Sequence, residues 1–353
     1  MRDNLKFFKN SKTQPLDKFF QTVLYDDKIG YYNSNLPFGS LGDFVTAPKI
    51  SRLFSEIIAI WLVSTWEILG RPKNINIVEL GPGDGTLMKD LLDTLDRFPE
   101  FNSSKSVYLY EVSSFLKKIQ KKNIKKKRIL WVNNFKQIKK GPVIFFGNEF
   151  FDAIPIKQFK KKKGVFFEKY FLLNQKNEIK EIFKKASKRD VKILKSYKSL
   201  KKLNFIEFPK IGLNELSKVT KKISKSGGCL LMIDYGYIKS SNNDTVQSVI
   251  KHKRNHILNN LGKADITSHV NFELLNEFFK KNNLKVKKIM TQQNFLRNMG
   301  IIERAENISK NMRFTEKTNL FLRLKRLMSH KLMGNLFKVI LTYKSKNNNY
   351  FGF

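Results

Sequence analysis

The chain has 353 residues, of which 41% are hydrophobic and 13% aromatic, so it can bury a sizeable core and is not disordered as a whole. Its single cysteine, Cys229, excludes a disulfide framework and a cysteine-based zinc site, and four scattered histidines exclude a histidine-rich site, so no metal is expected. The formal charge of +38 invites a nucleic-acid partner, but only 12 of the 68 basic residues are arginine. Lysine spread along the whole chain is typical of an A/T-rich genome, and we do not expect nucleic acid to be the partner.

Residues 1–70 are expected to form an N-terminal segment of helices and loop that caps the rest of the chain. Apolar side chains at helical spacing predict helices over Pro15–Tyr25 and Ile50–Leu69, joined by a loop rich in glycine and aromatic residues. No apolar run is long enough for a membrane span, and residues 1–15 lack the hydrophobic core of a signal peptide. We expect a soluble protein of a bacterial cytoplasm, with the mitochondrial matrix as the alternative.

Residues 71–353 alternate short apolar runs with helical patterns, which is typical of an α/β domain with a parallel sheet. Two insertions interrupt the pattern: residues 159–209 are interpreted as a β-hairpin around Gly164 plus charged, poorly patterned sequence, and residues 239–270 mostly as loop. The predicted helices are Thr86–Leu95, Ser114–Lys122, Leu213–Lys225 and Phe272–Asn282. The predicted strands are Ile75–Leu80, Val107–Glu111, Ile129–Val132, Pro142–Gly147, Cys229–Tyr235, Val286–Gln292 and Phe337–Tyr343.

The first of these strands runs directly into a glycine-rich loop. Gly81, Gly83 and Gly85 stand at alternate positions between strand and helix, so the backbone can approach a ligand without interference from Cβ atoms. The spacing matches neither a dinucleotide-binding loop nor a phosphate-binding P-loop. With Glu79 before it, the loop resembles motif I of class I S-adenosylmethionine (SAM) methyltransferases, so Glu79 and the three glycines are predicted to bind the cofactor.

Two polar residues after the next strands complete the predicted nucleoside site. Glu111 ends the second strand, where an acidic side chain can accept hydrogen bonds from both ribose hydroxyls. Asn134 follows the third strand, where this fold usually contacts adenine, although an Asx turn explains it equally well. An ordinary exposed acid at a strand end is the alternative for Glu111.

Eight segments that follow one another along the chain resemble the MidA-like family of SAM-dependent methyltransferases. The resemblance spans about residues 15–343, and the GDF-x-TAP and NEFFDA sequences within it are the most specific. The segments are Tyr25–Tyr32, Pro37–Ser51, Val78–Met88, Asn148–Ile156, Ile233–Gly236, Asp244–Gln247, Ala264–Phe272 and Met333–Val339.

The resemblance implies a class I methyltransferase fold, with a Rossmann-like seven-stranded sheet, a helical N-terminal extension and inserted substrate or cap segments. It implies SAM as cofactor, S-adenosylhomocysteine as product and a protein arginine as methyl acceptor. The mitochondrial member of the family is a protein arginine methyltransferase needed to assemble respiratory complex I, so a complex I core subunit is the expected partner. A homodimer is one assembly that the sequence leaves open.

The chain departs from the family pattern in three places. Lys49 stands where the family usually has Glu, and Asp84 stands where it usually has Arg. The loop around Ile257–Leu261 lacks the usual prolines. Lys49 inverts a charge near the expected site and puts the substrate contacts in question, whereas the change at Asp84 leaves the glycines untouched.

Carboxylates at the carboxyl edge of the sheet are the candidates for catalysis. Glu149 and Asp152 follow the fourth strand, at the edge where α/β sheets bind ligands. Arginine is a planar cation with delocalised lone pairs, and paired carboxylates would orient one nitrogen and localise charge away from it. Asn148 is expected to orient this group and the cofactor, and Asp265 to close the substrate side; helix capping is the alternative for Asp152.

Five further polar residues have a weaker prediction. Asp43 and Thr46 are expected to close over SAM, with a turn-forming role as the alternative for Asp43. His269 is interpreted as a structural hydrogen-bonding residue rather than a catalytic one. Asp234 and Tyr235 end the fifth strand and either contact the substrate or pack. 

Two functions besides protein arginine methylation stay open at this stage. The positive charge motivates methylation of RNA or a small molecule, although the sequence after the fourth strand lacks the motif of base-modifying enzymes. A SAM-binding assembly chaperone with little turnover is the third hypothesis, and it would not need the acids after that strand.

Overall fold

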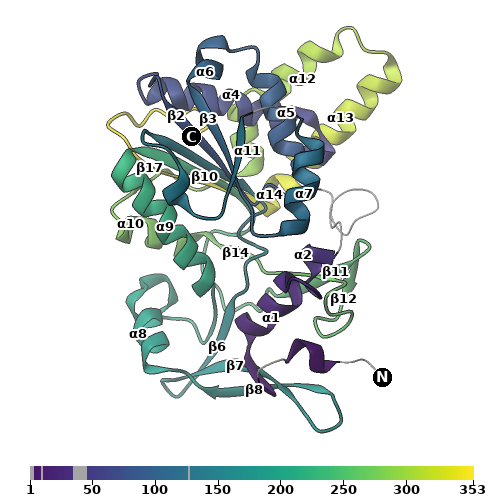
Figure 1. The fold of residues 1–353 in the computed structure, drawn as a ribbon, viewed down its shortest axis with the longest axis vertical. Helices are drawn as coiled ribbons and strands as arrows, with labels where there is room; N and C mark the ends of the chain where they lie inside the picture. The colour runs from purple at the N-terminus through teal and green to yellow at the C-terminus, as the bar shows by residue number, and fades with distance from the viewer. Residues whose placement is uncertain (1–3, 9–10, 35–45, 126–127) are drawn as a thin grey trace.

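The computed structural model describes residues 4–8, 11–34, 46–125 and 128–353. The main sheet of this part of the chain follows the strand order β15-β17-β10-β5-β2-β3-β4, and the short strands β14 (Val270–Asn271) and β16 (Met290–Thr291) pair with β10 and β17 (Figure 1). From β4 to β10 all neighbours are parallel, whereas β17 is antiparallel to both of its neighbours in that order. The strands are β2 (Ile75–Leu80), β3 (Lys105–Tyr110), β4 (Ile129–Val132), β5 (Val143–Asn148), β10 (Gly228–Tyr237), β15 (Lys285–Val286) and β17 (Phe337–Lys344). The predicted α/β class with a seven-stranded path is confirmed.

The order of the strands reverses at β2. The chain proceeds from β2 to β3 and β4 on one side, and then β5 returns to the other side of β2. In open α/β sheets, ligands bind in the crevice outside the carboxyl ends of the strands at such a point. Residues that follow β2, β3 and β5 therefore meet at one edge although they are far apart in the sequence.

Helices cover both faces of the sheet because its strands are apolar on both sides. Ile77 faces a core that includes α4 (Arg52–Ile68) and α5 (Thr86–Leu95). Its neighbour Val78 points the other way, into a core with α9 (Lys210–Ser226) and α10 (Phe272–Lys281). Further helices are α6 (Pro99–Ser104), α7 (Ser114–Asn123), α11 (Gln292–Asn298), α12 (Ile301–Ser309) and α13 (Phe314–Met328). None of the helices in the described residues is long and apolar enough to cross a membrane.

One predicted strand of the main sheet is wrong. In place of a strand over Val286–Gln292, the two-residue strands β15 and β16 pair separately with β17, and α11 begins directly after β16. The side chain of Thr291 accepts a hydrogen bond from the backbone N–H of Asn294 and so caps that helix. The cap therefore gives Gln292 to the helix, and residues 287–289 between the two short strands are not part of a strand.

The first insertion forms a second sheet with a strand from the N-terminus. The predicted hairpin around Gly164 is confirmed, but the sequence after it is ordered as β8, α8 (Lys188–Ser196) and β9, which corrects the expectation of unpatterned sequence. The ring of Phe19 on α1 (Leu16–Tyr25) packs 4.7 Å from that of Phe171, so α1 covers this sheet. The strands are β1 (Thr13–Pro15), β6 (Lys157–Lys162), β7 (Val165–Leu173), β8 (Ile179–Lys185) and β9 (Phe205–Phe208).

The second insertion is more regular than the predicted loop. It contains a three-stranded antiparallel sheet of β11 (Gln247–Ile250), β12 (Lys253–Asn255) and β13 (Asp265–Thr267). Each strand is too short to show a two-residue period in the sequence.

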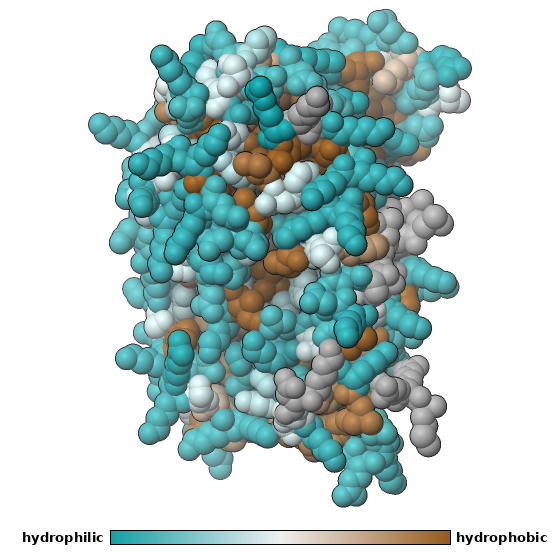
Figure 2. Space-filling model, in the orientation of Figure 1, coloured by the Kyte–Doolittle hydropathy of each residue, from teal (hydrophilic) through white to brown (hydrophobic). Residues whose placement is uncertain are grey.

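The face of the molecule drawn in Figure 2 is mostly hydrophilic, in keeping with the abundance of lysine.

Candidate active site

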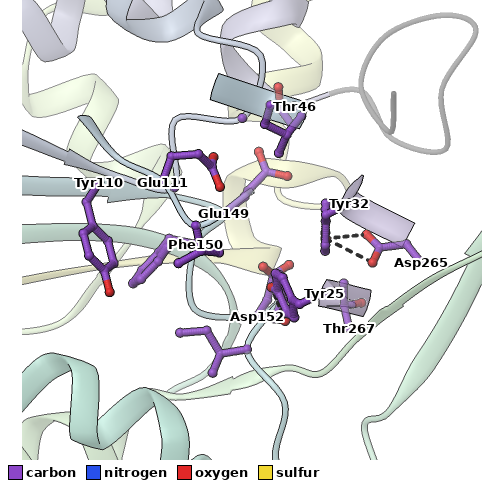
Figure 3. Close-up of a pocket in the computed structure, with 16 residues that line it drawn as sticks. Tyr25, Tyr32, Thr46, Tyr110, Glu111, Glu149, Phe150, Asp152, Asp265 and Thr267 are labelled. Atoms are coloured by element: carbon purple, nitrogen blue, oxygen red, sulfur yellow. Dashed lines mark hydrogen bonds between the residues drawn. The ribbon is translucent and has the colours of Figure 1, made fainter. Parts of the chain in front are cut away.

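Two adjoining hollows lie at the switch point of the main sheet. With the space that opens to solvent included, the first measures about 800 Å³ and the second about 410 Å³. Figure 3 shows the first, with side chains from α1, from the ends of β3 and β5 and from β13 converging on it. The two hollows share Thr46, Gly81, Gly83 and Glu149 in their walls, so they form one continuous site.

The three glycines of the loop after β2 do different things. All have positive φ angles, +63° at Gly81, +56° at Gly83 and +85° at Gly85. Gly81 and Gly83 line both hollows, and a Cβ at Gly81 would lie 2.7 Å from the Phe150 ring. Gly85 lines neither hollow; it precedes α5, and a Cβ there would lie 2.8 Å from Ile124. Gly85 thus serves helix packing, while the other two leave room for a ligand.

Glu111 is positioned by a side chain that the sequence reasoning missed. Its carboxylate is only 6% exposed and accepts hydrogen bonds from the Ser113 backbone N–H (2.8 Å) and from Gln120 Nε2 (3.0 Å). The same Nε2 donates to the Gly83 carbonyl (2.7 Å), and Gln120 Oε1 accepts from Trp131 Nε1 (2.8 Å). Burial raises the pKa of Glu111, and these donors oppose the rise. Gln120 therefore links the glycine loop to the acid predicted to bind ribose. In the sequence, the only sign of this role is an uncharged glutamine among the lysines of α7.

The second hollow offers two buried acceptors. Within the described residues, Glu79 Oε2 and Asn148 Oδ1 have no hydrogen-bond partner, and both residues line this hollow. Burial, together with Asp84 and Glu111, raises the pKa of Glu79 to about 8. Buried acceptors without donors are costly, and a cationic ammonium group would satisfy both. The amino-acid end of SAM carries such a group, so these residues fit the predicted cofactor.

Four carboxylates line the first hollow: Glu111, described above, and the predicted catalytic residues Glu149, Asp152 and Asp265. Glu149 has a strained φ of +53°, and its Oε1 accepts from Asn148 Nδ2 (3.0 Å) and from the backbone N–H of Ala47 (3.3 Å). Burial raises the pKa of Glu149 to about 7. Burial raises the pKa of Asp152 well above its usual range, and the charges of Glu149 and Asp265 add to the rise. The structure thus brings the three predicted catalytic residues together, in a pocket that disfavours their negative charges unless a cation enters.

Two tyrosines from the N-terminal segment close this acidic pocket. The rings of Tyr25 and Tyr32 stack with centroids 5.2 Å apart, and both line the hollow (Figure 3). The Tyr32 hydroxyl lies 3.0 Å from both carboxylate oxygens of Asp265, and that of Tyr25 donates to the Ala153 carbonyl (2.9 Å). The sequence analysis did not single out these tyrosines, although they lie in the first of the segments that carry the family resemblance.

Residues at the end of β10 support the site from outside it. The buried carboxylate of Asp234 accepts from the backbone N–H of Phe151 (2.7 Å) and so holds the turn that carries Glu149. The rings of Tyr235 and His269 meet edge to face with centroids 4.2 Å apart, and neither residue lines the two hollows. Burial and the charge of Lys338 lower the pKa of His269 to about 4, so it is neutral at physiological pH.

Three predicted residues of the cofactor site remain. Thr46 lines both hollows, and Asp43 lies outside the described residues. Asn134 is exposed and lines neither hollow; its side chain accepts from the backbone N–H of Lys136 (2.9 Å) and caps the 3₁₀ helix Phe135–Gln137. This capping role is the alternative that the sequence left open for Asn134.

The two residues that depart from the family pattern pair with each other. Lys49 Nζ lies 2.6 Å from Asp84 Oδ2. The other oxygen of Asp84 accepts from the backbone N–H (3.1 Å) and hydroxyl (2.8 Å) of Thr86, which fixes the carboxylate. The two charge changes in the sequence therefore belong to one ion pair, in which the base now stands at position 49 and the acid at position 84.

The strand order, the glycine loop at the switch point and the acid after the next strand define a class I SAM-dependent methyltransferase. The chain belongs to the S-adenosyl-L-methionine-dependent methyltransferase family Methyltransf_28, whose model matches residues 57–290. The predicted family, enzyme class and cofactor are thereby confirmed.

Similar proteins cover nearly the whole chain. The mitochondrial protein arginine methyltransferase NDUFAF7 of Xenopus laevis is 30% identical over 362 residues, which cover 95% of this chain and 82% of that protein. The human protein of the same name is 27% identical and covers 94% of this chain with 80% of its own length. A COG1565 superfamily member from Burkholderia thailandensis, solved with S-adenosyl-homocysteine bound, has a TM-score of 0.81 at 20% identity, with coverage of 96% of this chain and 90% of that chain. This likeness confirms the fold.

Proposed function

We propose that this methyltransferase transfers the methyl group of SAM to an arginine guanidinium of a protein. The observation that carries the proposal is the charge of the first hollow, which we assign to the methyl acceptor and call the acceptor pocket. Glu149, Asp152 and Asp265 line it, and its described lining contains no lysine or arginine, in a chain whose net charge is +38. A pocket that gathers acids in so basic a protein favours a cationic acceptor.

The cofactor half of the site is proposed to hold SAM through groups already in place. Gly81 and Gly83 let the backbone approach the ligand, and Glu111 accepts from the ribose hydroxyls. Glu79 and Asn148 accept from the ammonium group. When bound, SAM supplies an electrophilic methyl group on a sulfonium, and the in-line geometry of the transfer is set by where these residues hold it.

The acceptor half is proposed to prepare the guanidinium. Bidentate pairing with carboxylates draws positive charge toward two nitrogens and leaves the third with a more localised lone pair. The stacked rings of Tyr25 and Tyr32 add an attractive surface for the cation. As the N–CH₃ bond forms and the S–CH₃ bond breaks, the attacking nitrogen must lose a proton. Glu149, whose pKa is about 7, is suited to accept it.

The acceptor protein is proposed on the likeness to the mitochondrial arginine methyltransferases. Those proteins are named for arginine methylation, and the family resemblance adds a complex I core subunit as the acceptor. Those relatives are named mitochondrial, whereas we place this chain in a bacterial cytoplasm because of its A/T-biased composition. RNA as acceptor fits the net charge but not the acidic pocket, where phosphates would be repelled.

Mass spectrometry of purified complex I core subunits after incubation with the enzyme and SAM tests the proposal. One or two added methyl groups on one arginine are expected. Glu149→Gln and Asp152→Asn should each slow the reaction by about 100-fold or more, with SAM affinity little changed. Glu303→Gln, an exposed position on α12, is the matched control. Full activity of both pocket variants would refute the assignment of the carboxylates, and transfer to RNA alone would refute the acceptor.

A further inference from the structure

The short helix α3 (Ala47–Ile50) touches both halves of the site. Before it, Thr46 lines both hollows, and Pro48 lines the second. The backbone N–H of Ala47 donates to Glu149 on the acceptor side, and Lys49 pairs with Asp84 on the cofactor side. A helix of one turn has little stability of its own, so its place is set by these contacts together with Ala47 and Ile50, which are buried in the core with α4.

The ion pair is short and shielded from solvent. The Nζ–Oδ2 distance is 2.6 Å, and the side chains of Lys49 and Asp84 are only 19% and 13% exposed. Charges that are this shielded from solvent attract more strongly than a surface pair does. Asp84 cannot turn away, because its other oxygen is held by Thr86 at the start of α5. Lys49 thus meets a fixed anion in the wall of the second hollow.

We propose that the Lys49–Asp84 ion pair fastens α3 to the glycine loop and holds the wall of the cofactor pocket in place, so that both act as positioning residues for SAM. The inference rests on the proposed placement of SAM over the glycine loop. Because α3 also donates to Glu149, loosening it affects the acceptor carboxylate as well. The pair as a unit, rather than either charge alone, is what the pocket requires.

Calorimetric SAM binding to the full chain tests this with neutral isosteres. Lys49→Met keeps the aliphatic stem, and Asp84→Asn keeps the oxygen that accepts from Thr86. Each variant should weaken SAM binding by about tenfold, and the double variant should bind no more weakly than either single one, because the two losses are the same loss. Arg52→Gln removes a positive charge at the start of α4, two residues beyond α3, from a side chain that is 56% exposed, and it should bind as the wild type does.

Charge reversal sharpens the test. Lys49→Glu faces Asp84 with a second carboxylate and should weaken binding by about thirtyfold. Adding Asp84→Lys to Lys49→Glu restores an attractive pair but removes the oxygen that accepts from Thr86, so SAM affinity should recover in part and exceed that of Lys49→Glu alone. Thermal unfolding of each variant shows whether it is folded at the temperature of the titration.

The outcomes separate the inference from the conclusions on which it rests. Wild-type protein that does not bind SAM would refute the placement of the cofactor. Wild-type binding with an effect of Lys49→Met but none of Asp84→Asn would mean that Lys49 contacts the ligand directly, which overturns the ion-pair role. Losses that multiply in the double variant, or single variants that bind normally, overturn it too.

Discussion

The cofactor half and the acceptor half of this site are built in different ways. Most of the cofactor half comes from one stretch of chain, Glu79 to Gln120, and depends largely on backbone shape and on one buried amide network; Asn148 and the start of α3 complete it. The acceptor half gathers the end of α1 and the start of α2 (Tyr31–Ser34), the turn after β5 and strand β13. The first is mostly local in the sequence, whereas the second is assembled from distant segments around unfavourable negative charge. Cofactor binding should therefore resist changes in the acceptor half, while catalysis depends on both.

The largest effect is expected from Gly81→Ala. The residue has φ +63°, and the added Cβ would lie 2.7 Å from Phe150, so the loop must shift and SAM affinity should fall by about 100-fold. Gly164→Ala is the matched control, because Gly164 also has a positive φ (+79°) but no atom within 4 Å of its Cβ position. Calorimetry should show a loss of SAM affinity for Gly81→Ala and none for Gly164→Ala. Equal losses would mean that backbone strain alone, and not the shape of the pocket, is responsible.

The dependence of the reaction on pH tests the charge of the acceptor half. Glu149, with its pKa raised to about 7, is neutral below that pH, and both cation binding and proton transfer need the ionised form. The rate constant kcat/KM should rise about tenfold between pH 6 and pH 8. Glu149→Gln should flatten this rise, and a profile of unchanged shape in that variant would show that another group controls it.

The stability of the ligand-free protein should depend on pH in the opposite direction. Glu79 and Glu149 have folded pKa values of about 8 and 7, above the unfolded value of 4.5, so the folded protein keeps protons that the unfolded chain releases. The stability that these two groups contribute is fully present below pH 4.5. It is lost between pH 4.5 and the folded pKa values of about 7 and 8. The free energy of unfolding in urea should fall over this range, and less steeply for Glu149→Gln.

Gln120→Leu should lower SAM affinity by about fivefold, because Glu111, the Gly83 carbonyl and Trp131 lose a common partner. The KM of the acceptor should stay unchanged. Gln292→Leu is the matched control: it removes another buried amide, one that donates to the Leu327 carbonyl and lies outside both hollows. If both variants lose only stability and neither loses SAM affinity, Gln120 has no positioning role.

The smallest effect is expected for Tyr32→Phe. The variant keeps the stacked ring but removes the hydroxyl that donates to Asp265, and kcat/KM for the acceptor should fall by about threefold with SAM affinity intact. Tyr108→Phe, which removes a buried hydroxyl that accepts from the Lys139 N–H, is the control. A loss of SAM affinity in Tyr32→Phe would contradict the division of the site into two halves.

Sequence patterns predicted the main sheet well because its strands and helices bury whole faces. Helix Thr86–Leu95 has the predicted bounds, and Glu79, Gly81 and Glu111 lie where a strand and its following loop place them. The patterns failed where burial is partial. In β8 no side chain is fully buried, and the exposed residues stand in pairs rather than alternating with the half-buried ones. Helices α11 to α13 were not predicted because only a narrow stripe of each is buried.

By itself the sequence determined the class of fold, the cofactor loop and the family, because these depend on local periodicity and on glycines at fixed spacing. Only the tertiary structure decided which distant side chains share a pocket. It brought Tyr32 to Asp265, gave Gln120 its place between Gly83 and Glu111, and paired Lys49 with Asp84. Such contacts follow from how the inserted segments pack against the edge of the sheet, and a linear pattern carries no record of that packing.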